Sequence, residues 1–200
     1  MYNRVVTLSG VKDIDGLLAS MKETSVSALR AQRGYKGFSV SADRASGLVG
    51  TMTVWETEAD RDASDSALAK LREEITERFA TDIKIDTFEE RVVEVSKPPT
   101  VGSRLMVTRV SMDPAKVDEI IEAFRQEVVP QIKAAPGFRT LRNMINPQTG
   151  EGIAGTVWDD EKSMQAAAEM AMARRPEGEA RGVKFGETSY REIIFVDSLE

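Results

Sequence analysis

Two stretches of the chain spell Thr-Val-Trp followed by an acidic residue, and each contains residue types that could surround a small ligand. In an extended strand every second side chain lies on the same face. The residues on the tryptophan face are Thr51, Thr53 and Trp55 in the first stretch and Ala154, Thr156 and Trp158 in the second. Hydroxyl donors beside an aromatic wall in a dry cavity can stabilise negative charge that develops on a bound ligand. The same residues also have a structural interpretation, because tryptophan anchors cores and threonine favours strands.

Three further side chains are candidates for ligand contact, and each has an alternative structural role. Arg109 lies in the stretch LMVTRV, where it could hold an anionic ligand or be a charge at a strand edge. Asn143 and Asn146 could orient a ligand carbonyl, although the sequence NPQTG at Asn146 is first of all typical of a turn. Tyr35 follows a glycine at the expected end of a helix and could gate a cavity or cover the core. The candidate ligand-binding residues are Trp55, Trp158, Thr51, Thr53, Thr156, Arg109, Asn143 and Tyr35.

The composition excludes several kinds of chemistry. The 200-residue chain contains no cysteine and no histidine, so disulfides, thiolate nucleophiles, iron–sulfur clusters and Ser-His-Asp triads are absent. The net charge is −6, and Glu177 and Glu179 interrupt the most basic stretch, which argues against nucleic-acid binding. No apolar run approaches the ~20 residues that a membrane-spanning helix needs. We therefore expect a cytoplasmic protein without cofactor or metal that binds neither nucleic acid nor membrane.

Landmarks in the sequence recur about a hundred residues apart. Trp55 and Trp158 are separated by 103 residues, and the Gly-Phe pairs at 37–38 and 137–138 by 100. Similar offsets of this kind indicate an internal duplication. The proline-containing stretch SKPPTVG suits a connection between the copies. The predicted organisation is a first repeat over residues 1–95, a linker over 96–102 and a second repeat over 103–198.

Each repeat shows the order strand, helix, strand, strand, helix, strand. The expected first, third and last strands are 4–8, 48–55 and 88–95 in repeat 1 and 104–110, 151–158 and 190–196 in repeat 2. This order predicts an α+β fold of two ferredoxin-like repeats. Such a repeat has both helices on one face of its sheet, so we expect the second repeat to cover the other face and complete an intramolecular α+β barrel. The expected residues under the helices are Met52, Val54, Ile153 and Val157, with the tryptophan faces enclosing a cavity between the sheets.

Several helix boundaries are also visible. Asp113 followed by Pro114 is a strong start signal, and Thr57 with Asp60 resembles a capping box. Pro130 is expected to kink or end its helix, because proline has no amide hydrogen to donate. Two acidic pairs could bind a divalent cation or serve simply as helix starts: Asp13 with Asp15, and Asp159 with Asp160.

The motifs as a set resemble tandem antibiotic-biosynthesis-monooxygenase (ABM) domains of the dimeric α+β barrel superfamily. The matching segments are LRAQRGYKGF (29–38) and TVWETEAD (53–60) in repeat 1, and PQIKAAPGF (130–138) and GTVWDDEKSM (155–164) in repeat 2. The resemblance spans nearly the whole chain. It implies one of several activities, because the superfamily includes oxygenases, haem-degrading enzymes, isomerases and proteins without a known reaction.

The resemblance implies particular residues for two of those activities. Haem-binding members use a histidine, which this chain lacks, and the remaining candidate haem ligands are Tyr2, Tyr35 and Tyr190. Cofactor-independent oxygenases of the family are expected to carry an asparagine on the third strand, on the tryptophan face and one pleat repeat before it. Thr51 and Ala154 occupy those positions here.

Two hypotheses of different classes follow. The first is a cofactor-independent monooxygenase that oxidises a small aromatic or enolisable ligand, with the tryptophans as walls, the threonines as donors, and Arg109 and Asn143 balancing charge. The second is a catalytically silent ligand-binding or assembly protein of the same fold. We expect unequal pockets in the two repeats, and either a monomer with an internal pseudo-dimer or a homodimer.

Overall fold

The computed structural model describes residues 1–79 and 82–197 of the chain. These residues form two compact units. Unit 1 contains Met1–Thr87 and the segment that begins at Glu192, and unit 2 contains Phe88–Arg191. Residue 198, the predicted end of the second repeat, lies outside the described residues. No described helix is both long enough and apolar enough to cross a membrane.

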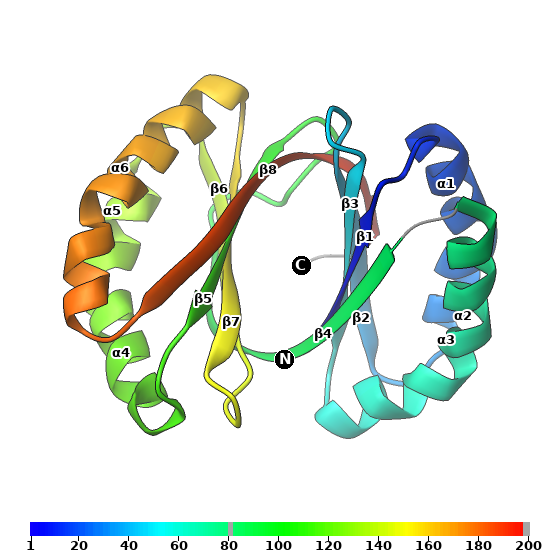
Figure 1. Cartoon of the computed structure of the whole chain (residues 1–200), viewed down its shortest axis with the longest axis horizontal. Helices are drawn as coiled ribbons and strands as arrows, with labels where there is room; N and C mark the ends of the chain where they lie inside the picture. The colour runs from blue at the N-terminus through cyan, green and yellow to red at the C-terminus, as the bar shows by residue number, and fades with distance from the viewer. Residues whose placement is uncertain (80–81, 198–200) are drawn as a thin grey trace. The chain divides into compact units, whose positions relative to one another are not determined.

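Unit 1 is a helical layer on one face of an antiparallel sheet (Figure 1). Its elements are β1 (Tyr2–Ser9), α1 (Ile14–Ser20), η1 (Met21–Ser25), α2 (Val26–Arg30), β2 (Tyr35–Asp43), β3 (Leu48–Trp55) and α3 (Glu58–Phe79). The strands pair in the order β1-β3-β2, and β2 continues to the second half of β8 (Lys184–Asp197). The third strand has the bounds that its β-branched and aromatic residues predict.

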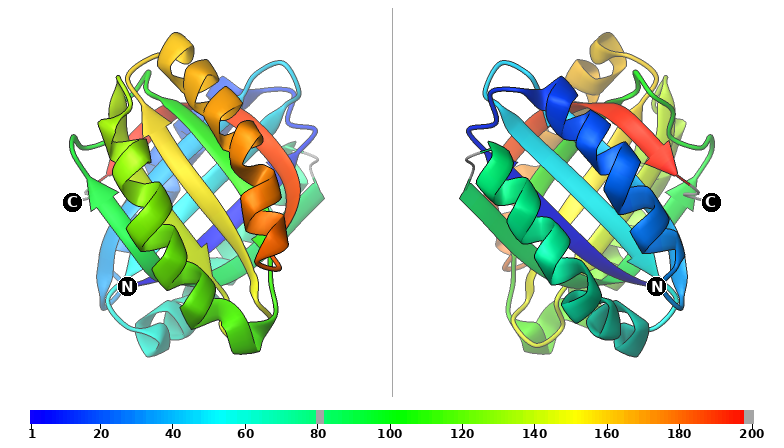
Figure 2. Two further views of the ribbon diagram at one scale, coloured as in Figure 1. Left: turned by 90° about the vertical axis from the view of Figure 1, so that its left-hand side faces the viewer. Right: turned by 90° about the vertical axis from the view of Figure 1, so that its right-hand side faces the viewer.

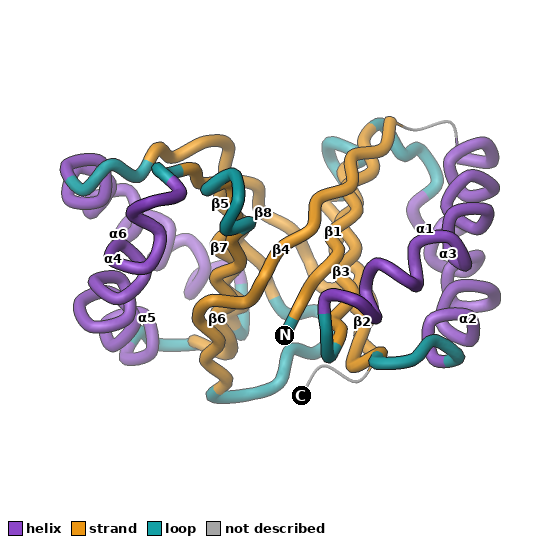
Figure 3. Tube along the Cα trace, turned by 90° about the horizontal axis from the view of Figure 1, so that it is seen from below, coloured by secondary structure: helices purple, strands orange, loops and turns teal. Residues whose placement is uncertain are grey.

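Unit 2 repeats this plan, with its helices running across one face of its strands (Figure 2, left). Its elements are β5 (Arg104–Ser111), η2 (Pro114–Lys116), α4 (Val117–Ala123), η3 (Phe124–Val128), α5 (Val129–Ala134), β6 (Phe138–Ile145), β7 (Glu151–Trp158) and α6 (Glu161–Ala180). The strand order is β8-β5-β7-β6-β4. Within each unit, the helices form one layer and the strands another, as Figure 3 shows. The predicted α+β class with ferredoxin-like repeats is confirmed.

The fourth strands are longer than the sequence suggested. Strand β4 (Asp82–Val95) and strand β8 each contain 14 residues. Residues 89–95 of β4 pair with β6 in unit 2, and residues 192–197 of β8 pair with β2 in unit 1. Each strand thus starts in one unit and ends in the other, so the units differ from the sequence repeats. The early halves were missed because they are mostly exposed and rich in polar residues.

The helix starts follow the capping chemistry in the sequence. Asp13 accepts a hydrogen bond from the Gly16 amide, Asp160 accepts one from the Ser163 amide at 2.8 Å, and Thr57 accepts one from the Asp60 amide at 3.1 Å. The member of each acidic pair that does not cap the helix has basic partners: Asp15 pairs with Arg44, and Asp159 pairs with Lys97 and Arg139. Within residues 1–79 and 82–197, no group of three or more acidic residues could hold a metal ion. The acidic pairs therefore act as caps and ion-pair partners.

The helical path does not end at Pro130, which was one of the two outcomes expected there. Proline sits in the first turn of α5, directly after a π-helical segment, η3. The π-helical segment changes the hydrogen-bond spacing just where the proline lacks an amide, so the helical path continues. Unit 1 has a π-helical segment, η1, at the matching place without a proline. The segment therefore belongs to the repeat itself.

A buried carboxylate in unit 1 links β8 to the end of α2. Arg30 donates to both carboxylate oxygens of Asp197, and the Tyr35 hydroxyl donates to Oδ2 at 2.8 Å. Hydrogen bonds from Arg30, then from Tyr35, lower the pKa of Asp197 although its burial opposes them. Tyr35, predicted as a ligand-binding gate, therefore has an intramolecular partner, and its ring lies edge-on to Trp55.

We expect Asp197→Asn to lower the free energy of unfolding at pH 7 by roughly 1–2 kcal/mol, because it weakens hydrogen bonds to a charged acceptor. The folded-state pKa is depressed, so this contribution is present above the unfolded-state pKa of about 3.9 and disappears as the pH falls through the folded-state value. In urea unfolding, the free energy of unfolding should fall more between pH 7 and about pH 3 for the wild type than for Asp197→Asn. An equal fall in both proteins would show that the charge of Asp197 does not contribute to stability.

Candidate functional site

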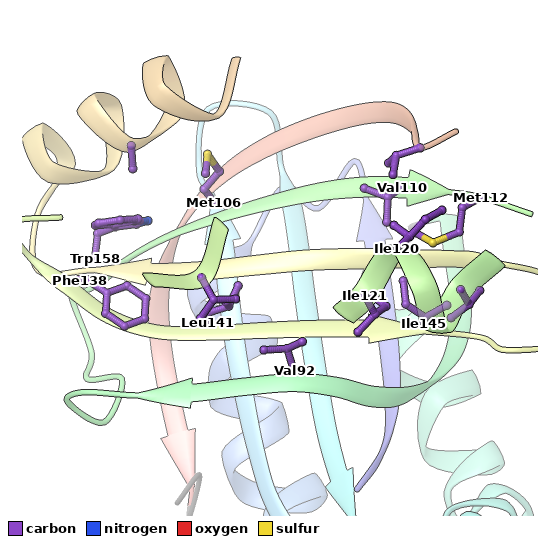
Figure 4. Packing of buried hydrophobic residues seen from close by; sticks show 14 of the residues in the cluster. Val92, Met106, Val110, Met112, Ile120, Ile121, Phe138, Leu141, Ile145 and Trp158 are labelled. Carbon is purple, nitrogen blue, oxygen red and sulfur yellow. The ribbon is translucent and has the colours of Figure 1, made fainter. Parts of the chain in front are cut away.

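Unit 2 contains a cavity of about 220 Å³ between the helix-facing side of its sheet and its helices. Strands β5, β6, β7 and β8 supply one wall, and α4, η3, α5 and α6 supply the other. Most of the lining is apolar, with Met106, Leu141 and Trp158 from the strands and Ile121 and Phe124 from the first helical segment. In Figure 4, Trp158 and Phe138 lie at one end of the buried cluster, and Val110 and Met112 at the other.

The prediction of which sheet face carries the helices is wrong. Trp158 packs in one buried cluster with Met164 and Ala167 of α6, so the tryptophan face lies under the helices. Ile153 and Val157, expected there, lie on the opposite face of β7. Strand alternation separates two faces correctly but does not say which face the helices cover. The candidate cavity is consequently inside unit 2.

The tryptophan motif has the same geometry in both units. The Trp158 indole N–H donates to the Thr156 hydroxyl at 2.9 Å, and Trp55 donates to Thr53 at the same distance. The Trp158 ring also meets Phe138 edge-on, with centroids 5.7 Å apart. Both indoles are therefore satisfied within the fold. Trp158 is a wall of the cavity and does not offer its N–H to a ligand.

One row of side chains crosses the floor of the cavity. Asn143 on β6 lies opposite Ala154 on β7, and Ala154 lies opposite Thr108 on β5. The Thr108 hydroxyl is 3.0 Å from the Thr188 hydroxyl on β8, which accepts a hydrogen bond from Arg175 of α6. All five residues line the cavity. The row has an amide at one end, a guanidinium at the other and a small apolar residue between them.

Asn143 presents an unsatisfied polar atom at one end of this row. The residue is 5% exposed, and its Oδ1 has no hydrogen-bond partner among the described residues. A buried acceptor left unpaired costs about 1–3 kcal/mol, so native structures rarely keep one without a reason. Ala154 occupies the position where the family resemblance led us to expect an asparagine, and Asn143 is its cross-strand neighbour.

Charged residues gather on the helical side of the cavity and are mostly paired. Arg181 pairs with Glu127 at 2.7 Å, and Arg174 pairs with Glu177 at 2.9 Å. Met172 is 62% exposed and lines the same cavity. The methionine-rich stretch of α6 therefore contributes a soft, adaptable wall there, in addition to core packing.

Unit 1 has a much smaller cavity of about 70 Å³, so the prediction of unequal pockets is confirmed. At the register position of Met106, unit 1 has Arg4, which donates to Ser64 and to the Arg61 carbonyl. At the position of Asn143 it has Val40. Larger or internally bonded side chains fill the space that is open in unit 2.

The structure divides the predicted site residues into four groups. Trp158, Thr156 and Asn143 line the unit 2 cavity, and Thr51 and Thr53 line the small unit 1 cavity. Trp55 is fully buried in the unit 1 core, and Tyr35 hydrogen-bonds to Asp197. Arg109 lies on the face of β5 opposite Thr108 and Val110 and does not line this cavity, so its contact with a ligand stays a prediction.

Three polar residues of the row across the cavity floor were not predicted as ligand contacts: Thr108, Thr188 and Arg175. Thr108 alternates with Met106 and Val110 in the strand sequence, so the tryptophan-face argument could have included it. Thr188 lies in the unrecognised first half of β8. Arg175 lies in the basic stretch that was interpreted as a solvated loop, whereas α6 extends through it to Ala180.

Comparison with known proteins gives distant relatives. No family model matches the chain. The uncharacterised protein Rv2557 of Mycobacterium tuberculosis (strain ATCC 25618 / H37Rv) is 24% identical over 166 residues, covering 82% of this chain and 74% of its own. The uncharacterised protein Rv2558 of the same strain is 22% identical and is covered over 70% of its length.

Solved structures share the fold over nearly the full length. A proposed monooxygenase from Lactobacillus acidophilus NCFM matches with a TM-score of 0.69 and 13% identity over 98% of this chain and 96% of its own. An anthrone oxidase-like protein matches with a TM-score of 0.68 and 16% identity, over 98% of this chain and 93% of its own. A ferredoxin-fold protein of Listeria monocytogenes 4b F2365 is related to antibiotic biosynthesis monooxygenases. It matches with a TM-score of 0.58 and 6% identity, over 96% of this chain and 94% of its own. The chain therefore has the ABM-like, monooxygenase-like fold.

Proposed function

We propose that unit 2 binds a small hydroxylated aromatic ligand in its helix–sheet cavity and oxidises it without a cofactor. The observation that carries this proposal is the unpaired Oδ1 of Asn143, buried in an otherwise largely apolar cavity. A ligand hydroxyl that donates to this atom would remove the cost of leaving it unpaired. The fold shared with an anthrone oxidase-like protein supports the reaction class.

The reaction that suits this site converts an activated methylene between aromatic rings into a carbonyl. Molecular oxygen supplies the new carbonyl oxygen, and its second atom leaves as water with the two methylene hydrogens. The apolar walls exclude solvent from the reacting carbon, and Asn143 orients the ring system through its hydroxyl. The strand residues of the cavity include hydroxyls and one amide but no carboxylate.

The absence of a base on the strand side favours a second candidate, a binding protein that performs no oxidation. Glu127 and Glu177 line the cavity on its helical side, and each is paired with an arginine. Oxygen uptake separates the two candidates. Incubation with 1,8-dihydroxyanthrone should consume oxygen and form the quinone if the chain is an oxidase, and should show binding alone if it is silent.

We expect Asn143→Leu to weaken ligand binding by at least about tenfold and to raise the free energy of unfolding by about 1 kcal/mol. Both effects have one cause: the variant removes a buried acceptor that only a ligand satisfies. Calorimetric binding of 2-naphthol and urea unfolding would measure them.

Asn3→Leu is the matched control. Both polar atoms of the Asn3 side chain are buried without partners, but Asn3 lines neither cavity. The affinity of Asn3→Leu for 2-naphthol should equal that of the wild type. Unchanged binding in Asn143→Leu, with full binding in the wild type, would remove Asn143 from the site.

A further inference from the structure

Arg175 lines the cavity and forms no ion pair within the described part of the chain. Its guanidinium donates to the Thr188 hydroxyl at 3.0 Å and lies 5.4 Å from the centroid of the Phe185 ring. Among residues 1–79 and 82–197, no carboxylate forms an ion pair with it. Arg174 and Arg181, which also line the cavity, each have a glutamate partner. Arg175 therefore has donors and a positive charge available to a ligand.

The matching position in unit 1 shows an ion pair that Arg175 lacks. The tryptophan offset of 103 residues places Arg175 at the position of Arg72 in unit 1, and Ala168 at the position of Asp65. In unit 1, Arg72 forms an ion pair with Asp65 at 2.6 Å. In unit 2 the acid is replaced by an alanine that lines the cavity. Unit 2 therefore has the guanidinium of Arg175 without a carboxylate at the matching position.

The cavity floor sets the distance between this charge and Asn143. Asn143, Ala154 and Thr108 occupy three neighbouring strands at matched register, and Thr188 lies on the next strand. Neighbouring strands are about 4.8 Å apart, so Asn143 and Thr108 are separated by about 10 Å across the sheet. The small side chain of Ala154 leaves the middle of this floor open. A flat system of two or three fused rings fits such a floor.

We infer that the ligand is a flat aromatic carboxylate with a hydroxyl at its far end. Its carboxylate binds Arg175 and the Thr188 hydroxyl, its rings cover Ala154, and its hydroxyl donates to Asn143 Oδ1. A guanidinium fork matches the two oxygens of a carboxylate, whereas a phenolate offers one oxygen. This inference rests on the proposed binding site in unit 2 and adds the charge and length of its ligand.

The test compares 6-hydroxy-2-naphthoate with 2-naphthol by calorimetry at pH 7. The wild type should bind the carboxylate at least about tenfold more tightly, as expected for a charge-assisted contact. Arg175→Gln should abolish that preference and leave 2-naphthol binding nearly unchanged. Arg175→Lys should retain part of it, because the charge stays and the fork is lost.

A second variant tests the same contact without removing the arginine. Ala168→Asp rebuilds the ion pair found in unit 1 and should also abolish the carboxylate preference. Arg125→Gln is the control for net charge, because Arg125 pairs with Glu122 on the exposed surface and does not line the cavity. Its affinities should equal those of the wild type.

The outcomes separate the two levels of the proposal. Equal affinity of the wild type for both probes, unchanged in Arg175→Gln, would overturn the carboxylate inference and leave the proposed binding site in place. Absence of binding by both probes would overturn the proposed site and the inference together. A carboxylate preference that persists in both Arg175→Gln and Ala168→Asp would assign the charge contact to another residue.

Discussion

Replacing Trp158 by alanine is expected to lower the free energy of unfolding by about 3–5 kcal/mol. The indole is 1% exposed, donates to Thr156 and contacts the Phe138 ring edge-on. Truncation removes these contacts together, and the protein cannot close the space by simple relaxation because the site already borders a cavity. Chemical unfolding monitored by circular dichroism measures the loss.

The duplicated motif provides the comparison for this prediction. Trp55 has the same Thr53 bond and an edge contact with Tyr35, so Trp55→Ala should be destabilising by a similar amount. Only Trp158→Ala should alter ligand binding, because Trp55 lines neither cavity. A loss below about 1 kcal/mol for Trp158→Ala would show that the motif is not a core anchor.

Replacing Ala154 by phenylalanine is expected to abolish ligand binding, by about a hundredfold or more, with a small change in stability. The residue is partly exposed to the cavity and lies midway along the row from Asn143 to Thr108. A phenyl ring there would occupy the space that we assign to the ligand. Binding of 2-naphthol and urea unfolding distinguish a blocked site from an unfolded protein.

Thr51→Phe is the matched substitution in unit 1. Thr51 has the same register relative to its tryptophan, but its cavity is only about 70 Å³. Overpacking should lower stability by about 1–3 kcal/mol while ligand binding is retained. Undiminished binding in Ala154→Phe would place the ligand outside the unit 2 cavity.

The elements of the fold were predictable where local chemistry determines them. Strand β7 runs from Glu151 to Trp158 as its composition indicates, and Asp160 begins α6 as its capping chemistry indicates. Repeated landmarks predicted two units with the same order of elements, and the elements of units 1 and 2 follow that order. The π-helical segments and the strands that run from one unit to the other depend on long-range packing. No local sequence pattern around Phe124 predicts the π-helical segment, and none around Lys184 predicts the long strand β8.

The candidate site was predictable only in part. Strand alternation correctly placed Thr156 and Trp158 on one face of the strand, but it does not determine which face the helices cover. Asn143 became informative only when cross-strand register placed it beside Ala154. No single stretch of sequence identifies Arg175 as a ligand contact. Its identification needs its hydrogen bond to Thr188 and the presence of alanine, not an acid, at position 168. The predicted covering of one sheet by the other stays a prediction.

A crystal structure of the protein with 6-hydroxy-2-naphthoate tests the proposed ligand site most directly. We expect one ligand in the cavity of unit 2, lying over Ala154, with its hydroxyl within hydrogen-bond distance of Asn143 Oδ1. A ligand bound elsewhere, with this cavity empty and the Asn143 amide still unpaired, would contradict it.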